Sequence, residues 1–198
     1  MKKLILICLC FTFPAISLCQ KTVTPAEDIQ YGIYLNFTEF QKNKPSIVAG
    51  FKPVYRGDYY GYPPTRLKIK TPEGKYVILD KPAWGYRDSA NFYIYRKGFN
   101  KLEKFGRYCV FEGLKRTLPE IGAIDKVINI IDAKVKYLDY ILDISSGQIV
   151  KATKSSILKI LADDRELYRD FKKNGKKIDV YTFVERYNQR HPIVYPVK

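Results

Sequence analysis

Cys109 and His191 are the residues whose side chains are best suited to catalysis. Cys109 is the single cysteine beyond residue 19, and His191 is the one histidine of the chain. A cysteine nucleophile needs a base and a partly exposed, electropositive setting, but His191 stands far from Cys109 in the sequence. Cys109 lies between Tyr108 and Val110 in a strand-like stretch. We therefore expect it to pack in the core as a small hydrophobic residue.

The sequence indicates neither a metal site nor a bound cofactor. Zinc and iron sites built on histidine and cysteine need more ligands than this chain supplies. The pair Asp163-Asp164 fits helix capping better than calcium binding. Gly57, Gly61 and Gly85 match neither the P-loop nor the dinucleotide-binding pattern. The predicted cofactor is therefore none.

Acidic residues near aromatic ones leave one enzymatic alternative open. Glycoside hydrolases place two carboxyl groups across the scissile bond of a sugar. The acidic residues with aromatic neighbours in the sequence are Asp58, Asp80, Asp88, Glu103 and Asp139. Their spacing singles out no pair, and Asp58 and Asp88 also fit solvated turns. A carbohydrate-active hydrolase that uses two carboxylates is thus the alternative function.

A basic and aromatic stretch from Lys81 to Gly113 offers a non-enzymatic site. It contains the single tryptophan and several tyrosines between arginines and lysines. On a sheet, such a face can hold an acidic or sugar ligand. The candidate ligand or partner surface is Tyr59, Tyr60, Trp84, Tyr86, Arg87, Tyr93 and Tyr95. The structural alternative is cross-strand pairing that stabilises the sheet, with the tyrosines of the loop at 50–64 covering one end.

The N-terminal residues have the features of an export signal. Lys2 and Lys3 precede the apolar run Leu4–Leu18, which is short for a membrane span. Cleavage after Cys19 would remove residues 1–19 as a signal peptide and leave 20–198 as a single domain. The alternative is a lipid anchor on Cys19. We expect a protein of the periplasm or cell surface, or a secreted protein, with no membrane span in the mature chain.

The chain is strongly basic, with a formal net charge of +15. For an exported protein, the natural counterparts of this charge are an acidic envelope protein or an anionic polysaccharide, and nucleic acid is not expected. The basic residues are spread along the chain, so a solvated surface also explains them.

Alternating side chains and turn residues predict strands between residues 20 and 152. In the clearest hairpin, Leu67 and Ile69 point inward while Arg66, Lys68 and Lys70 point outward, and the turn 72–74 leads back into 75–80. Further strands are expected at 32–35, 83–87, 91–96, 107–112, 136–144 and 148–151. The stretch 50–64 is expected to be a loop, and 97–106 a link.

Helical spacing predicts helices between residues 153 and 191, with a short one after Asn36. Asn36 and Glu39 have the spacing of a capping box, as do Asp163 and Glu166. Val180, Phe183, Val184 and Tyr187 form an apolar stripe. A helix is also expected at 116–134. The predicted fold class is α+β, a mostly antiparallel sheet built from hairpins with a C-terminal group of short helices.

Several stretches together resemble a known family. These are GIYLNFTEF, WGYRD with YIY, GRYCVFEG, YILDISSGQI and the ending LADDRELYRDFKKN…ERYNQR. They resemble an uncharacterised family of small exported proteins (a domain of unknown function) from Bacteroidetes-type bacteria. The resemblance implies an exported bacterial protein of unknown function and transfers no catalytic residues.

The function best supported by the sequence is a non-enzymatic binding module at the cell envelope. The export signal, the basic and aromatic composition and the lack of a catalytic set favour it. Its partner would be a protein or an anionic glycan.

Overall fold

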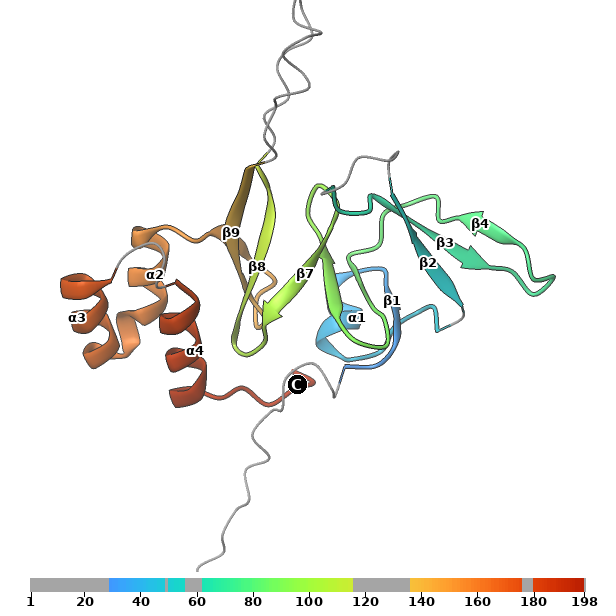
Figure 1. The fold of residues 1–198 in the computed structure, drawn as a ribbon. Helices are drawn as coiled ribbons and strands as arrows, with labels where there is room; N and C mark the ends of the chain where they lie inside the picture. Colours follow the sequence, from blue (N-terminus) through green and yellow to red (C-terminus); the bar gives the residue numbers. More distant parts are fainter. Residues whose placement is uncertain (1–28, 49, 56–61, 116–135, 176–179, 198) are drawn as a thin grey trace, which may run out of the picture.

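The computed structural model describes residues 29–48, 50–55, 62–115, 136–175 and 180–197 (Figure 1). Within these residues, ten strands form two antiparallel sheets, and short helices follow the last strand. The predicted α+β fold class is confirmed. The expected signal peptide, Tyr59, Tyr60 and the expected helix at 116–134 lie outside the described residues. Among the described residues, no helix combines the length and the apolarity that crossing a bilayer requires.

The larger sheet has seven strands. In spatial order they are β1 (Gly32–Tyr34), β5 (Gly85–Arg87), β6 (Phe92–Tyr95), β7 (Phe99–Lys104), β8 (Tyr108–Lys115), β9 (Lys136–Asp143) and β10 (Ile149–Lys151). The predicted strands at its edges and centre are confirmed. The expected link at 97–106 is wrong, because β7 pairs with β6 on one side and β8 on the other. Its sequence FNKLEK has weak strand propensity, so neighbouring backbones stabilise it.

The smaller sheet has three strands in the order β2 (Phe51–Val54), β3 (Arg66–Lys70) and β4 (Tyr76–Ile78). The predicted hairpin of β3 and β4 is confirmed, with its turn at Gly74 in a left-handed conformation. The expectation of a loop throughout 50–64 is wrong for β2. Pro53 is compatible with this strand because β2 lies at an edge of its sheet, where proline is tolerated.

Five helical segments accompany the sheets in the described part of the chain. They are α1 (Phe37–Gln41), α2 (Lys154–Ile160), the 3₁₀ helix η3 (Leu161–Asp163), α3 (Arg165–Asn174) and α4 (Val180–Arg190). Asn36 caps α1 as predicted, since its side chain accepts a hydrogen bond from the Glu39 N–H. A capping box would also require the Glu39 carboxylate to accept a hydrogen bond from the Asn36 N–H. The carboxylate instead accepts from the N–H of Leu35, the preceding residue.

The helices α2, α3 and α4 cover one face of β8 and β9. Val110 and Ile141 of these strands pack with Leu167, Phe171 and the predicted stripe of α4, all of them buried. Full burial of a side chain such as Phe171 contributes about 1.5–3 kcal/mol. Cys109 and Phe111 point to the opposite face, because neighbouring residues of a strand alternate, and Cys109 is completely buried there.

The smaller sheet packs on the larger one near β1, β5 and β6. Buried residues between the two sheets are Ile33, Leu67, Ala83, Tyr86 and Phe99. One face of the smaller sheet is therefore committed to the core. The smaller sheet and the C-terminal helices lie at opposite ends of the molecule (Figure 1).

Candidate partner-binding surface

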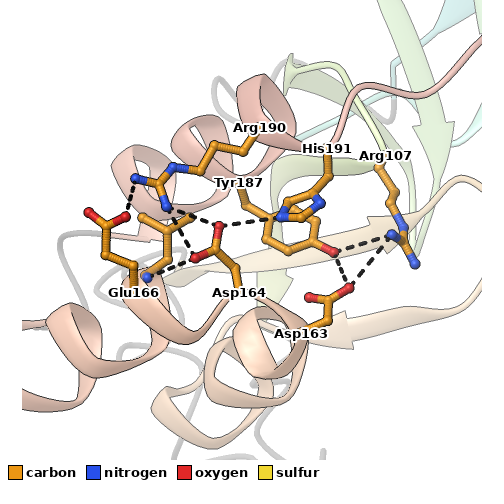
Figure 2. Close-up of polar contacts among 8 residues, drawn as sticks. Arg107, Asp163, Asp164, Glu166, Tyr187, Arg190 and His191 are labelled. Atoms are coloured by element: carbon orange, nitrogen blue, oxygen red, sulfur yellow. Dashed lines mark hydrogen bonds and ion pairs between the residues drawn. The ribbon is translucent and has the colours of Figure 1, made fainter.

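Charged side chains cluster where α3 begins and α4 ends (Figure 2). Asp164 is the N-cap of α3 and accepts a hydrogen bond from the Leu167 N–H at 3.0 Å. The predicted cap, Asp163, is thus one residue too early. Arg190 donates to both oxygens of Asp164 at 3.1 and 3.2 Å and to Glu166 at 2.9 Å. These contacts join the last turn of α4 to the first turn of α3.

The same cluster extends to the sheet through Tyr187. Its hydroxyl donates to Asp163 at 2.8 Å and accepts from Arg107 at 3.2 Å. The ring of His191 stacks on the Tyr187 ring with centroids 4.4 Å apart, and its Nε2 lies 3.3 Å from Asp164 Oδ2. Arg107 immediately precedes β8. The cluster therefore connects both helices to the larger sheet.

The cluster has the character of a structural junction. The Leu167 N–H, and then the hydrogen bonds from Arg190 and His191, hold the pKa of Asp164 below its usual value. Burial, and then the hydrogen bond to Asp163, raise the pKa of the Tyr187 hydroxyl. None of the contacts that the structure describes for this cluster involves a serine, threonine or cysteine side chain.

Cys109 lies elsewhere, as a core residue. Burial raises the pKa of its thiol to about 12, so the nucleophilic thiolate is scarce at neutral pH. In the described part of the chain, no group of three or more His, Cys, Asp and Glu residues is arranged to hold a metal ion.

Three tyrosines of the predicted surface, Tyr86, Tyr93 and Tyr95, lie between the two sheets. Tyr86 is buried and stacks on Tyr93 at 4.6 Å, with the two rings nearly parallel. Tyr93 and Tyr95 are half-buried and pack on the same core cluster. Much of their ring surface therefore contributes to the packing of one sheet on the other.

The structure separates the tryptophan and the arginine from these tyrosines. Trp84 lies at a bend before β5, where its ring packs against Phe40 at 4.7 Å and Phe37 at 5.3 Å. Arg87 is on the other face of β5 from Tyr86, since neighbouring residues of a strand point to opposite faces. A single ligand surface formed by all seven predicted residues remains a prediction, because Tyr59 and Tyr60 lie outside the described residues.

Several basic residues of this stretch contact other side chains of the chain. The guanidinium of Arg96 lies 4.1 Å from the centre of the Tyr140 ring. Lys101 pairs with Glu103 at 3.7 Å, and Lys104 pairs with Glu185 at 2.9 Å. These contacts fit the alternative interpretation, in which the stretch stabilises the sheet.

A different set of basic residues shares the outer face of the smaller sheet. The register pairs Lys52 with Lys68, and Lys68 with Ile78 across the other side of β3. Residues directly opposite each other point to the same face, and so do alternate residues of one strand. The outer face consequently comprises Lys52, Val54, Arg66, Lys68, Lys70, Tyr76 and Ile78. We call this set the cationic face.

The cationic face contains four positive charges and no acidic residue. No ion pair among the described residues involves any of the four. Lys52 and Lys68 stand directly opposite each other, an arrangement of like charges that destabilises a sheet. Lys52 also lies 4.2 Å from the centre of the Tyr76 ring. The side chains of Lys52, Arg66, Lys70, Tyr76 and Ile78 are exposed.

A pocket of about 430 Å³ lies beyond the Ile78 end of β4. Leu67, Leu79 and Tyr95 contribute apolar surface to it, and Arg66 and Lys81 contribute positive charge beside the carboxylate of Asp80. Among the described residues of the predicted surface, Tyr95 lines this pocket. The pocket gives the edge of the smaller sheet a concave site for a side chain.

Sequence reasoning found part of this surface. The alternation in β3 correctly placed Arg66, Lys68 and Lys70 outward. Lys52 was not predicted to belong to this surface, because Gly50 and Pro53 indicated a loop in place of β2. The period-two pattern of Lys52 and Val54 against Phe51 and Pro53 was the signal that could have revealed it.

Comparison with models of protein families gave a match. The model of "Family of unknown function (DUF6563)" matches residues 32–191, which include both sheets and the helices that the structure describes. No curated protein and no solved structure matches the chain.

Proposed function

Since the chain belongs to the family of unknown function DUF6563, we propose from its own geometry that it is a non-enzymatic module that binds an anionic partner. The cationic face of the smaller sheet is the contact surface. The observation that carries the proposal is a sheet face with four cations and no acid, two of the cations directly opposed. An anionic partner would replace this repulsion by attraction.

The magnitudes favour a partner with repeated negative charges. One exposed ion pair contributes only about 0.2–1 kcal/mol, so a single charge would bind too weakly to be specific. Four pairs formed together contribute roughly 1–4 kcal/mol by the same measure. Neighbouring strands are about 4.8 Å apart, and alternate residues of a strand about 7 Å. The charges of the partner should recur at similar distances, as in an extended polyanion.

Apolar groups next to the cations add contact area. Tyr76 and Ile78 are exposed on the same face as Lys68 and Lys70. A tyrosine can stack on a flat group while its hydroxyl stays in water. Together these side chains would provide the non-electrostatic part of the affinity.

The alternative function, a carbohydrate hydrolase, needs two carboxyl groups roughly 5–10 Å apart beside a bound sugar. Among the described residues that line it, the pocket at β4 has one carboxylate, Asp80. A groove of about 590 Å³ between β9, β10 and α2 also has one, Asp143, which accepts hydrogen bonds from Ser145 and Ser146. These two sites of the described chain therefore give the alternative no specific support.

The proposed place of action is the cell envelope. It rests on the basic and apolar character of residues 1–19. Mass spectrometry of the N-terminus of the protein produced in a bacterial host tests it. A chain that begins at Gln20 would support export, a diacylglyceryl group on Cys19 would support lipid anchoring, and an intact N-terminus in the cytoplasm would contradict both.

Binding to alginate and to poly-L-glutamate tests the proposed function. We expect both polyanions to bind, with an affinity that falls as salt is added. The double variant Lys68→Glu/Lys70→Glu should weaken binding about tenfold or more, because each reversal removes an attraction and adds a repulsion.

The control Lys154→Glu/Arg169→Glu makes the same change in net charge at the opposite end of the molecule, on exposed positions of α2 and α3. It should change the affinity little. Equal loss in both double variants would mean that net charge alone drives binding and would contradict the proposal.

A further inference from the structure

The backbone of β4 has one unpaired edge. In the hairpin, the Leu79 N–H bonds to the Leu67 carbonyl at 2.9 Å, and the Thr71 N–H bonds to the Lys75 carbonyl at 2.7 Å. Hydrogen-bonded pairs alternate along an antiparallel ladder, so Val77 is the residue of β4 that bonds to β3. The N–H and C=O groups of Tyr76 and Ile78 therefore point away from the sheet. In the described structure, β4 pairs with β3 alone.

This edge also exposes apolar side chains. Tyr76, Val77 and Ile78 are 44%, 45% and 43% exposed. A strand edge with unpaired backbone groups and exposed apolar side chains is a template for another strand. The opposite edge of the same sheet is a poor template, because Pro53 of β2 has no N–H to donate there.

The charges select the strand that can be added. A second copy paired through β4 would bring two cationic faces side by side, at a cost from like charges. An acidic strand would instead place its carboxylates next to Tyr76 and Ile78, within reach of Lys68 and Lys70. Its alternate residues would point toward the side of Val77, which shares the inner face with Ile69 and Leu79.

We propose that the edge of β4 binds an extended acidic segment of another protein as a fourth strand. This inference rests on the proposed function and names the class of partner. The segment alternates acidic residues, which face the lysines, with apolar residues, which face the inner side. An apolar residue near one end of the segment enters the pocket beyond Ile78, where Leu67, Leu79 and Tyr95 provide the contacts. Main-chain hydrogen bonds provide affinity and the alternation provides specificity.

A synthetic peptide of about eight residues that alternates glutamate and valine tests the proposal. Its binding is compared with that of the same peptide N-methylated at every second residue. This methylation keeps the charge of the peptide and removes the N–H donors along one edge of the peptide strand. We expect the unmodified peptide to bind and the peptide methylated on the edge that faces β4 to bind at least tenfold more weakly. Two methylated peptides, one for each alternate set, cover both edges.

Variants of Ile78 test the main-chain hydrogen bonds between the peptide and β4 by changing the protein. Ile78→Pro removes an N–H that points out of the sheet, at an edge position where proline is tolerated. Ile78→Ala keeps this N–H and removes most of the side chain. Peptide affinity should fall at least tenfold in Ile78→Pro and less in Ile78→Ala. The methylated peptides leave the protein unchanged, so the test does not depend on how the proline variant folds.

The outcomes separate this inference from the proposed function. Equal binding of the unmodified peptide and both methylated peptides would overturn strand addition. Binding of alginate and poly-L-glutamate without binding of the peptide would also overturn it while leaving the proposed function intact. Failure of all these probes would overturn both. A dimer in analytical ultracentrifugation that Ile78→Pro abolishes would identify a second copy as the occupant and would overturn the acidic partner.

Discussion

Reversing the charge of Lys68 should raise stability and lower binding at the same time. Lys68 faces Lys52 directly across β2 and β3. A cross-strand pair of charges changes stability by about 0.2–1 kcal/mol, unfavourably for like and favourably for opposite charges. Lys68→Glu replaces the like-charged pair with Lys52 by an oppositely charged pair. We therefore expect the free energy of unfolding to rise by about 0.5–1 kcal/mol, allowing for the exposure of Lys52.

The same substitution should weaken polyanion binding roughly fivefold or more, because a lost and inverted contact costs on the order of 1 kcal/mol or above. Urea unfolding measures the first effect, and titration with poly-L-glutamate measures the second. Lys154→Glu is the matched control. It adds an acid to the first turn of α2, which the helix dipole favours, so it should not destabilise the protein and should leave binding nearly unchanged.

A Lys68→Glu protein that is less stable than the parent would refute the assigned register or the electrostatic reasoning. A Lys68→Glu protein that binds poly-L-glutamate as tightly as the parent would refute the cationic face as the site.

The remaining predictions concern other parts of the fold. Asp164→Ala should lower the free energy of unfolding by about 1 kcal/mol or more through loss of the α3 cap, whereas Asp164→Asn keeps a capping oxygen. The folded-state pKa of Asp164 is lowered, so its negative charge stabilises the fold above the unfolded-state pKa, and this contribution is lost as the pH falls through the folded-state pKa. Urea unfolding measured at several pH values should therefore show that the stability of Asp164→Asn depends less on acid pH than that of the parent. An unchanged pH profile would contradict this role. Peptide mapping after treatment with a thiol reagent should find Cys109 unmodified in the native protein and modified in urea; rapid native modification would show that the site opens. Gly147→Ala should destabilise the turn between β9 and β10 by about 1–2 kcal/mol, because Gly147 has a φ of +75° and a Cβ there would lie 2.7 Å from the Phe37 ring; an unchanged urea midpoint would argue against this turn.

Local patterns in the sequence predicted much of the fold. The alternation of Leu67 and Ile69 with lysines fixed the faces of β3 correctly, and the spacing of Val180, Phe183, Val184 and Tyr187 predicted the buried stripe of α4. Cys109 was expected in the core and is there. In each case the signal lies within a few residues, because side-chain period and burial determine the element together.

The missed elements depend on contacts between distant residues. The sequence of β7 contains Lys101, Glu103 and Lys104, and it becomes a strand because β6 and β8 both pair with it. Pro53 is compatible with β2 only because β2 is an edge strand. Neither fact can be read from the local sequence.

In the candidate site too, local patterns and contacts between distant residues lead to different groupings of residues. The predicted surface grouped Trp84 with Tyr86, Tyr93 and Tyr95 because they are close in sequence. The bend at Trp84 directs its ring toward Phe40, while Tyr86 packs between the sheets. The cationic face arises instead from three strands whose register brings Lys52 opposite Lys68. That register depends on the pairing of β2 with β3, two strands that are separated in the sequence.

Amide chemical shifts during a titration with poly-L-glutamate test the central claim most directly. If the cationic face is the binding surface, the largest changes will map to the amides of Lys52, Lys68, Lys70, Tyr76 and Ile78, and they will disappear in Lys68→Glu/Lys70→Glu. Changes centred on β6 to β8 or on α3 and α4, with those of the smaller sheet unaffected, would contradict it.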